Sequence, residues 1–146
     1  MFINFFIHMN LNHSFQLRVR YAETDQMGVV YHANYLNYFE VGRVEWLRKK
    51  GLSYKKLEDE GIGLPIVNIN ISYKKSAKYD DLLTINTTLK SFEGVKVYFD
   101  CEIRNENGQL LTTAEFLLIF INLKTLKPCA PPHKIANILI GTLDQN

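Results

Sequence analysis

Asp25 and His32 are the residues whose types and spacing could carry out acyl-transfer chemistry. Asp25 lies in a turn that contains Gly28, and His32 comes just before a long segment with helical spacing. The first backbone N–H groups of a helix lack intrahelical acceptors and can polarise a carbonyl oxygen. A carboxylate facing that carbonyl could attack it or deprotonate a water molecule. We therefore take Asp25 as a candidate catalytic carboxylate, with the amides of Tyr31 and His32 as candidate oxyanion donors.

The same residues also have an ordinary structural interpretation. An aspartate just before a helix is a common N-cap, whose side chain accepts a hydrogen bond from the first turn. Tyr31 and His32 could then be first-turn residues that pack on a sheet. Residue types alone favour this capping interpretation of Asp25, and only a longer motif can reverse that preference.

A longer motif is present between residues 18 and 35. It consists of Arg18-Val19, Thr24-Asp25, Gly28-Val29-Val30, His32 and Tyr35. This spacing resembles the active-site signature of the 4-hydroxybenzoyl-CoA thioesterase family. The run Gly-Val-Val-Tyr-His-Ala-Asn-Tyr is most similar to the Tol-Pal-associated acyl-CoA thioesterase branch of that family. The resemblance continues through residues 65–67 and 79–83, so that it covers most of the chain from about residue 15 to residue 123.

The resemblance implies both a fold and an activity. It implies an α+β hotdog fold, in which an antiparallel β-sheet is wrapped around a long central α-helix, in a homodimer or homotetramer. It also implies hydrolysis of an acyl-CoA thioester with no metal or other cofactor. Asp25 would be the catalytic carboxylate, and the His32 backbone N–H would polarise the thioester carbonyl. Gly28, Val29, Tyr31 and Tyr35 would shape the turn and the substrate pocket.

Binding of the coenzyme would need cations for its phosphates. The candidates are Lys74, Lys75 and Lys78, which precede Tyr79, together with Lys90 and Lys96, and solvated strand ends are the alternative interpretation of each. The best-known 4-hydroxybenzoyl-CoA enzymes carry basic residues on the loop where this chain has Glu93-Gly94-Val95, which is a departure from the family pattern. An acyl carrier protein, held by a basic surface, is a second candidate partner.

Size and composition indicate one domain. The chain has 146 residues, 47% of them hydrophobic, which is enough for one core. We expect residues 15–146 to form this domain and residues 1–14 to be a flexible tail, with Met9 as an alternative start. This tail lacks the pattern of a signal peptide, and no segment is long enough to span a membrane.

Charge and cysteine content narrow the function further. A net charge of +2 with scattered lysines and arginines gives no support to nucleic-acid binding. Cys101 and Cys129 fit neither a disulfide framework nor a zinc ligand pair, which favours a reducing compartment and hence the cytoplasm. The four histidines have no metal-ligand spacing, and no nucleophile elbow, P-loop or complete dinucleotide fingerprint is present.

Hydrophobic periodicity predicts the elements that would position Asp25. Helices are expected at 33–50, 53–60 and 131–140, and strands at 15–21, 67–73, 83–92, 95–104 and 110–123, with a hairpin turn at 105–109. The last helix is expected to be peripheral. Within the long helix, Glu40 either approaches the pocket or pairs with Arg43, and we favour the ion pair.

The main hypothesis is therefore an acyl-CoA thioesterase. The alternative is a non-catalytic protein on the same fold that binds acyl-CoA or acyl carrier protein as a scaffold. Such a protein would have no need of the carboxylate at position 25. A dehydratase on a hotdog fold would be expected to have a different arrangement of histidine and acid.

Overall fold

The computed structural model describes residues 11–144 of the chain. The helices are α1 (Asn34–Lys49), α2 (Tyr54–Asp59) and α3 (His133–Asp144). The strands are β1 (Asn12–Arg18), β2 (Ile62–Gly63), β3 (Ile66–Tyr73), β4 (Leu82–Glu93), β5 (Lys96–Arg104), β6 (Leu110–Ile119) and β7 (Ile121–Asn122).

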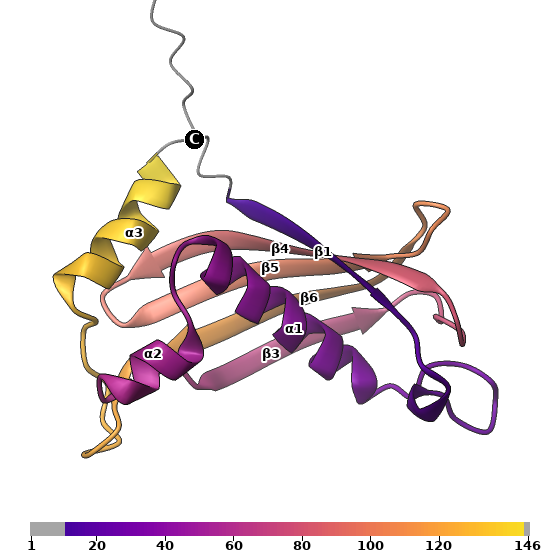
Figure 1. The fold of residues 1–146 in the computed structure, drawn as a ribbon, viewed down its shortest axis with the longest axis horizontal. Coiled ribbons are helices and arrows are strands. Elements are labelled where there is room, and N and C mark those ends of the chain that lie inside the picture. The colour runs from indigo at the N-terminus through magenta and orange to yellow at the C-terminus, as the bar shows by residue number, and fades with distance from the viewer. Residues whose placement is uncertain (1–10, 145–146) are drawn as a thin grey trace, which may run out of the picture.

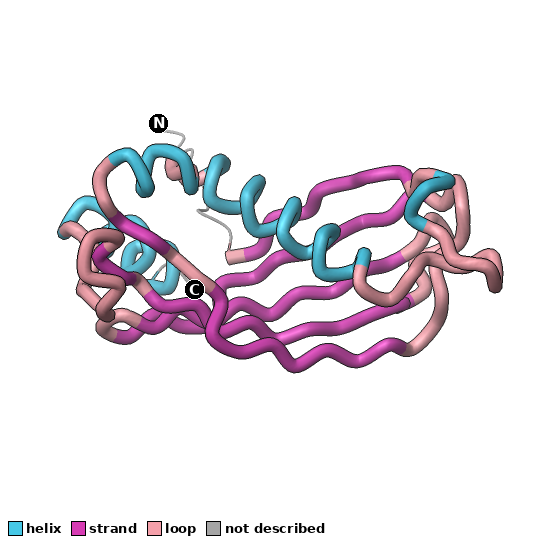
Figure 2. The backbone as a smooth tube through the Cα atoms, turned by 90° about the horizontal axis from the view of Figure 1, so that it is seen from below, coloured by secondary structure: helices cyan, strands magenta, loops and turns pink. Residues whose placement is uncertain are grey.

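Five strands form one antiparallel sheet in the order β1-β4-β5-β6-β3, and β2 pairs with β7 in a small second sheet. Helix α1 lies across one face of the curved main sheet (Figures 1 and 2). On β5 the residues Val97, Phe99, Cys101 and Ile103 are buried and alternate with more exposed ones, as the period of two predicts. The α+β hotdog fold expected from the sequence is confirmed.

Close contact between α1 and the sheet depends on Gly42. A Cβ atom at this position would lie 2.5 Å from Cγ2 of Ile85 and 2.8 Å from Oγ1 of Thr87. One turn further along the helix, the Trp46 ring packs edge-on against Phe99 with centroids 5.1 Å apart. Its Nε1 donates a hydrogen bond to the Leu11 carbonyl oxygen at 2.8 Å. Helix, central strand and the start of β1 therefore meet at one point in the core.

The first strand differs from its predicted bounds at both ends. It begins at Asn12, because residues 12–14 pair with residues 86–88 of β4. It ends at Arg18, since the chain then turns into a short 3-10 helix, Tyr21–Glu23. Tyr21 was the last residue of the predicted strand, but it lies in this 3-10 helix and is 78% exposed. Of the expected flexible tail, residues 1–14, residues 12–14 therefore belong to β1, and residues 1–10 lie outside the described part of the chain.

The last helix is longer and less peripheral than predicted. It runs to Asp144, and Ile135 and Leu139 are buried within the core. Figure 1 shows α3 at the end of the sheet, beside the end of β4. None of the helices in the described residues combines the length and the apolar character that crossing a membrane would require.

Candidate active site

The loop between β1 and α1 forms a tight turn around Asp25. The Asp25 backbone N–H donates to the Val29 carbonyl oxygen at 2.8 Å, and the Gly28 N–H donates to the Asp25 carbonyl oxygen at 3.0 Å. Gly28 adopts a φ of +80°, a conformation that glycine reaches without the steric cost other residues bear. The turn predicted from the sequence therefore exists, and Gly28 supplies the backbone geometry it needs.

The Asp25 side chain stabilises this turn with one oxygen only. Its Oδ1 accepts the Met27 N–H at 2.8 Å, while no described residue donates a hydrogen bond to Oδ2. The N-cap of α1 is Ala33, and no side chain caps this helix. The capping interpretation of Asp25 is therefore wrong, because its carboxylate bonds within its own turn rather than to the helix.

Asp25 opens into a cavity of about 240 Å³ at the start of α1. The residues that line it are Asp25, Met27, Val29, Val30, His32, Tyr35, Tyr73, Lys74, Lys75 and Ser76. The cavity thus brings together seven residues singled out in the sequence, which are Asp25, Val29, Val30, His32, Tyr35, Lys74 and Lys75. They come from the β1–α1 loop, the first turn of α1 and the end of β3.

The two candidate oxyanion donors, the backbone N–H groups of Tyr31 and His32, differ in whether they already have an acceptor. The Tyr31 N–H donates to the Glu23 carbonyl oxygen at 2.9 Å, so it is already engaged. The His32 N–H has no acceptor among the described residues. The prediction that both amides face the substrate carbonyl is wrong for Tyr31. Its N–H is bonded to the carbonyl oxygen of Glu23, the last residue of the 3-10 helix before Asp25. His32 retains an amide that can still donate.

Two tyrosines form the inner wall of this cavity. Tyr35 is buried, and its hydroxyl accepts the Ala77 N–H at 3.0 Å. Burial raises the pKa of Tyr35, so its phenol stays protonated at neutral pH. Tyr73 packs against it with ring centroids 5.4 Å apart. Sequence reasoning placed Tyr73 on a strand but not in the site, and the only available signal was its position at the end of that strand.

Gly28 and Tyr31 lie beside the cavity rather than in its wall. Gly28 is exposed at the tip of the turn. The Tyr31 side chain is 47% exposed, and its ring lies against that of His32 with centroids 4.4 Å apart. Their expected part in shaping the turn is compatible with this geometry, but neither side chain lines the cavity.

Only some of the candidate lysines are brought together. Lys74 and Lys75 line the Asp25 cavity, whereas Lys78 does not. Lys90 lies on the sheet face turned away from α1, where its Nζ is 2.9 Å from Oε1 of Glu115. Lys96 begins β5, at the end of the sheet opposite the Asp25 loop, and does not line the cavity. A role for Lys90 or Lys96 beside Asp25 therefore has no geometric support within this chain.

The predicted ion pair between Glu40 and Arg43 is absent from the described residues. Arg43 points inward and is only 3% exposed, with its guanidinium carbon 4.3 Å from the centre of the Phe116 ring. Glu40 stays on the exposed side of α1. Helical spacing allows the pair, but packing of Arg43 over the sheet separates the two charges.

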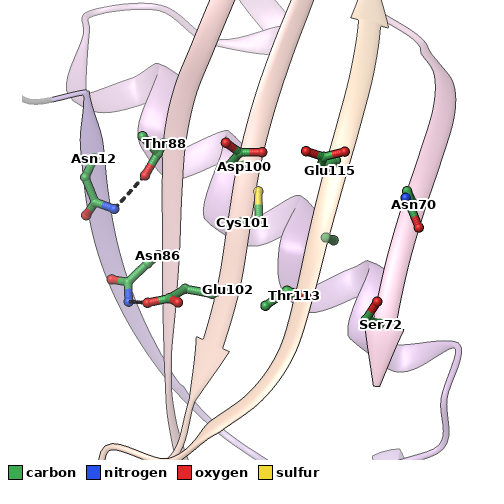
Figure 3. A pocket seen from close by; sticks show the side chains of 11 residues that line it. Asn12, Asn70, Ser72, Asn86, Thr88, Asp100, Cys101, Glu102, Thr113 and Glu115 are labelled. Carbon is green, nitrogen blue, oxygen red and sulfur yellow. Dashed lines mark hydrogen bonds between the residues drawn. The ribbon is translucent and has the colours of Figure 1, made fainter. Parts of the chain in front are cut away.

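A larger hollow, of about 480 Å³, lies on the sheet face away from α1. Figure 3 shows its polar lining, with Asp100 and Glu115 on neighbouring strands and Thr88 beyond them. None of the residues that the sequence suggested for catalysis or substrate binding lines it. The arrangement that suits acyl transfer is therefore the smaller cavity around Asp25.

Comparisons with known proteins agree with this fold. The protein YneP of Bacillus subtilis (strain 168) is 41% identical over 113 residues, covering 77% of this chain and 82% of that protein. The acyl-CoA thioester hydrolase YbgC of Escherichia coli O157:H7 is 35% identical over 119 residues, covering 82% of this chain and 89% of that protein. A crystal structure of DHNA-CoA thioesterase from Staphylococcus aureus matches with a TM-score of 0.86 and 34% identity, covering 91% of each chain.

A family match covers most of the chain. The thioesterase-like superfamily matches residues 19–139, a span that includes the Asp25 turn, α1 and all of β3 to β6. The resemblance predicted from the motif at residues 18–35 is confirmed, and the chain belongs to the thioesterase-like superfamily.

Proposed function

We propose that this protein hydrolyses an acyl-CoA thioester to a free acid and coenzyme A. The observation that carries the proposal is the shared cavity of Asp25 and His32, in which one carboxylate oxygen and one backbone N–H have no partner among the described residues. A carboxylate beside an unengaged amide donor is what attack on a polarised carbonyl needs. The thioesterase relatives support the same chemistry.

In the proposed mechanism the His32 N–H donates to the thioester carbonyl oxygen and stabilises the negative charge that develops there. Oδ2 of Asp25 takes a proton from the attacking water, or attacks the carbonyl carbon itself to form a mixed anhydride that water then hydrolyses. Oδ1 remains bonded to the Met27 N–H, which fixes the direction of the carboxylate. The thiolate of coenzyme A is the leaving group in both routes.

Lys74 and Lys75 support the coenzyme as substrate, because they place two cations on the wall of the Asp25 cavity. An acyl carrier protein carries the same phosphopantetheine thioester on a protein surface and is the second candidate substrate. The cytoplasm is the expected compartment, since both cysteines of the chain are free.

We also propose that the chain assembles into a homodimer or homotetramer. Within residues 11–144, strand β3 pairs only with β6, so its other edge offers unpaired backbone groups to a second copy. Ile66 and Val67 on this strand are 39% and 50% exposed. Sedimentation equilibrium tests the proposal, and a chain that stays monomeric at micromolar concentration contradicts it.

The test of the activity is release of free thiol from a panel of short-chain, long-chain and aromatic acyl-CoAs, followed with a thiol-reactive chromogen. Cys129 is exposed and would react with that reagent, whereas Cys101 is buried and its pKa is raised to about 12. The assay therefore uses a Cys129→Ser background. Asp25→Asn is measured in parallel, and asparagine keeps the Oδ1 acceptor for the Met27 N–H.

The expected result is loss of turnover in Asp25→Asn by about 10²-fold or more, with no change in assembly. Asp80→Asn is the matched control, because Asp80 does not line the cavity and asparagine tolerates its φ of +70°. Near-normal hydrolysis by Asp25→Asn would refute the role of Asp25. If the folded wild type hydrolyses none of the acyl-CoAs, a carrier-protein substrate or the binding-only alternative is favoured. Transfer of oxygen-18 into the enzyme in a single turnover distinguishes nucleophile from base.

A further inference from the structure

Tyr21 and Tyr79 form an exposed aromatic pair at the active-site end of the chain. Their ring centroids lie 5.6 Å apart with an interplanar angle of 82°, and the two residues are 78% and 56% exposed. In this edge-to-face arrangement at least one face of each ring is left uncovered by the other ring. The pair therefore contributes little to the core and presents flat ring faces to solvent.

The aromatic pair is close to the Asp25 cavity. Lys78, the residue before Tyr79, is paired with Val29 through an isolated antiparallel bridge, and Val29 lines the cavity. Paired Cα atoms in such a bridge are roughly 5 Å apart and consecutive Cα atoms about 3.8 Å, so the Cα atoms of Tyr79 and Val29 are at most about 10 Å apart. Tyr21 begins the 3-10 helix that leads into the Asp25 turn. A ligand that extends out of the cavity can therefore reach both rings.

Three lysines follow one another along the loop from β3 towards Tyr79. Lys74 and Lys75 line the cavity, and Lys78 is exposed beside Tyr79. None of these loop lysines forms an ion pair within residues 11–144. Ammonium groups that are not paired with a carboxylate suit the phosphates of a nucleotide. The loop therefore presents cations first and an aromatic surface next, in the direction away from the cavity.

The arginines around the two tyrosine rings, by contrast, are already paired with carboxylates. Arg18 lies 3.8 Å from Asp80, and Arg20 lies 2.9 Å from Glu23. A phosphate placed on the rings would compete with these carboxylates and be repelled by them. An uncharged base meets no such repulsion, and stacking on an aromatic side chain is a general way for proteins to hold a base. The charges thus favour phosphates at the loop lysines and a base at the rings.

We propose that Tyr21 and Tyr79 bind the adenine base of coenzyme A, while its phosphates lie along the loop lysines and the thioester lies in the Asp25 cavity. This inference rests on the proposed use of a coenzyme A thioester. It also specifies how the chain distinguishes coenzyme A from a carrier-protein thioester, which has no adenine. The aromatic pair adjoins β1 and β4, whereas the proposed second copy pairs with β3 at the other edge of the sheet, so assembly leaves the rings open.

The first test is isothermal titration calorimetry of the full-length, assembled protein with coenzyme A and with pantetheine 4′-phosphate, which lacks the nucleotide. Tyr21→Ala and Tyr79→Ala are each expected to weaken binding of coenzyme A about 5- to 30-fold and to leave binding of pantetheine 4′-phosphate unchanged. Tyr21→Phe and Tyr79→Phe keep the rings and should bind both probes as wild type does. Ile140→Ala, at a 45% exposed residue of α3 outside the Asp25 cavity, is the matched control and should change neither affinity.

Two further measurements separate stacking from a structural effect. Saturation-transfer NMR of the wild type with coenzyme A should give strong signals from the adenine C–H protons, and Tyr21→Ala should lose them while the pantetheine signals remain. In steady-state hydrolysis, the alanine variants should raise KM for an acyl-CoA by a factor similar to the loss of affinity and leave kcat unchanged, because the base is remote from the reacting carbonyl. KM for the matching acyl-pantetheine should stay at the wild-type value.

Several outcomes would overturn the proposal. They are wild-type affinity for coenzyme A in both alanine variants, an equal loss of affinity for both probes, phenylalanine variants as weak as the alanine variants, and no binding of coenzyme A by the wild type. A larger effect of the alanine variants on an acyl carrier protein thioester than on acyl-CoA would instead assign the rings to a protein partner.

The proposed hydrolysis is tested separately from this inference. Coenzyme A binding that depends on the two rings would support the adenine site even if no acyl-CoA is hydrolysed. Hydrolysis of acyl-CoA with unchanged KM in Tyr21→Ala and Tyr79→Ala would refute the adenine site and leave the proposed function intact.

Discussion

The Tyr73 hydroxyl donates a hydrogen bond to the backbone oxygen of His32, with the two oxygens 3.0 Å apart. This bond joins the end of β3 to the segment that precedes α1. Tyr73→Phe is expected to lower kcat/KM about 3- to 10-fold, because the peptide that carries the proposed donor loses one fixed contact. Steady-state kinetics measure the effect. Tyr79→Phe, at an exposed tyrosine outside the cavity, is the control and should match wild type.

Glu23 stabilises the turn that precedes Asp25. Its Oε1 accepts the Arg20 backbone N–H at 2.8 Å and the Tyr38 hydroxyl at 3.0 Å, and its backbone oxygen accepts the Tyr31 N–H. Burial alone would raise the pKa of Glu23, but the hydrogen bonds from Arg20 and Tyr38 outweigh it and hold the pKa below the ordinary 4.5. Glu23 is therefore expected to stabilise the fold in its ionised form.

The pH dependence of Glu23→Gln follows from this direction. A lowered pKa in the folded state means that the carboxylate stabilises the protein fully above its unfolded value of 4.5, and that this stability is lost as pH falls through the folded value. We expect Glu23→Gln to lower the free energy of unfolding by about 1 kcal/mol at pH 7. Urea unfolding at several pH values should show this difference shrinking below pH 4.5. A difference that grows on acidification would contradict the argument.

Gly42→Ala should destabilise the protein by about 1–3 kcal/mol, because the added Cβ would lie 2.5 Å from Ile85 Cγ2 and force the helix off the sheet. Gly141→Ala is the matched control in α3, where the added Cβ meets nothing within 4 Å. There the substitution should be neutral or stabilise by about 0.5–1 kcal/mol through helix propensity. Chemical denaturation of both variants checks the pair, and equal effects would show that close packing at Gly42 is unimportant.

Replacement of Lys74 and Lys75 by glutamine should raise KM for an acyl-CoA about fivefold and change kcat little, because the two cations would contact the phosphates and not the reacting carbonyl. Added salt should weaken binding by wild type more than by the double variant. Lys90→Gln serves as the control, since Lys90 pairs with Glu115 on the opposite face of the sheet. A larger effect from Lys90 than from Lys74 and Lys75 would overturn this assignment.

The fold and the Asp25 turn could be predicted because their signals are local. Alternation along β5, helical spacing in α1 and the Gly108 turn each depend on residues close in sequence. The motif at residues 18–35 also lies within one short segment, and its members Asp25 and His32 reach the same cavity. Local patterns and the family motif were therefore sufficient to find the candidate catalytic pair.

The features that the sequence did not predict depend on tertiary packing. Helical spacing cannot say that Arg43 turns over Phe116 instead of pairing with Glu40. A register shift between Leu89 and Ser91 interrupts the regular pairing of β4 with β5 beside Lys90. No residue type in this segment predicts the shift. The Tyr31 amide is engaged because Glu23 folds back onto it. Each of these outcomes is decided by a neighbour outside the local pattern.

Because α1, β5 and the residue before β1 meet at Trp46, the intrinsic fluorescence of this residue reports on the fold. Trp46 is the single tryptophan of the sequence, it is fully buried, and its indole N–H donates to the carbonyl oxygen of Leu11, the residue before β1. Its fluorescence should shift to longer wavelength when water reaches the ring. Emission from one side chain therefore reports, without a label, whether a variant retains both its packed helix and its first strand.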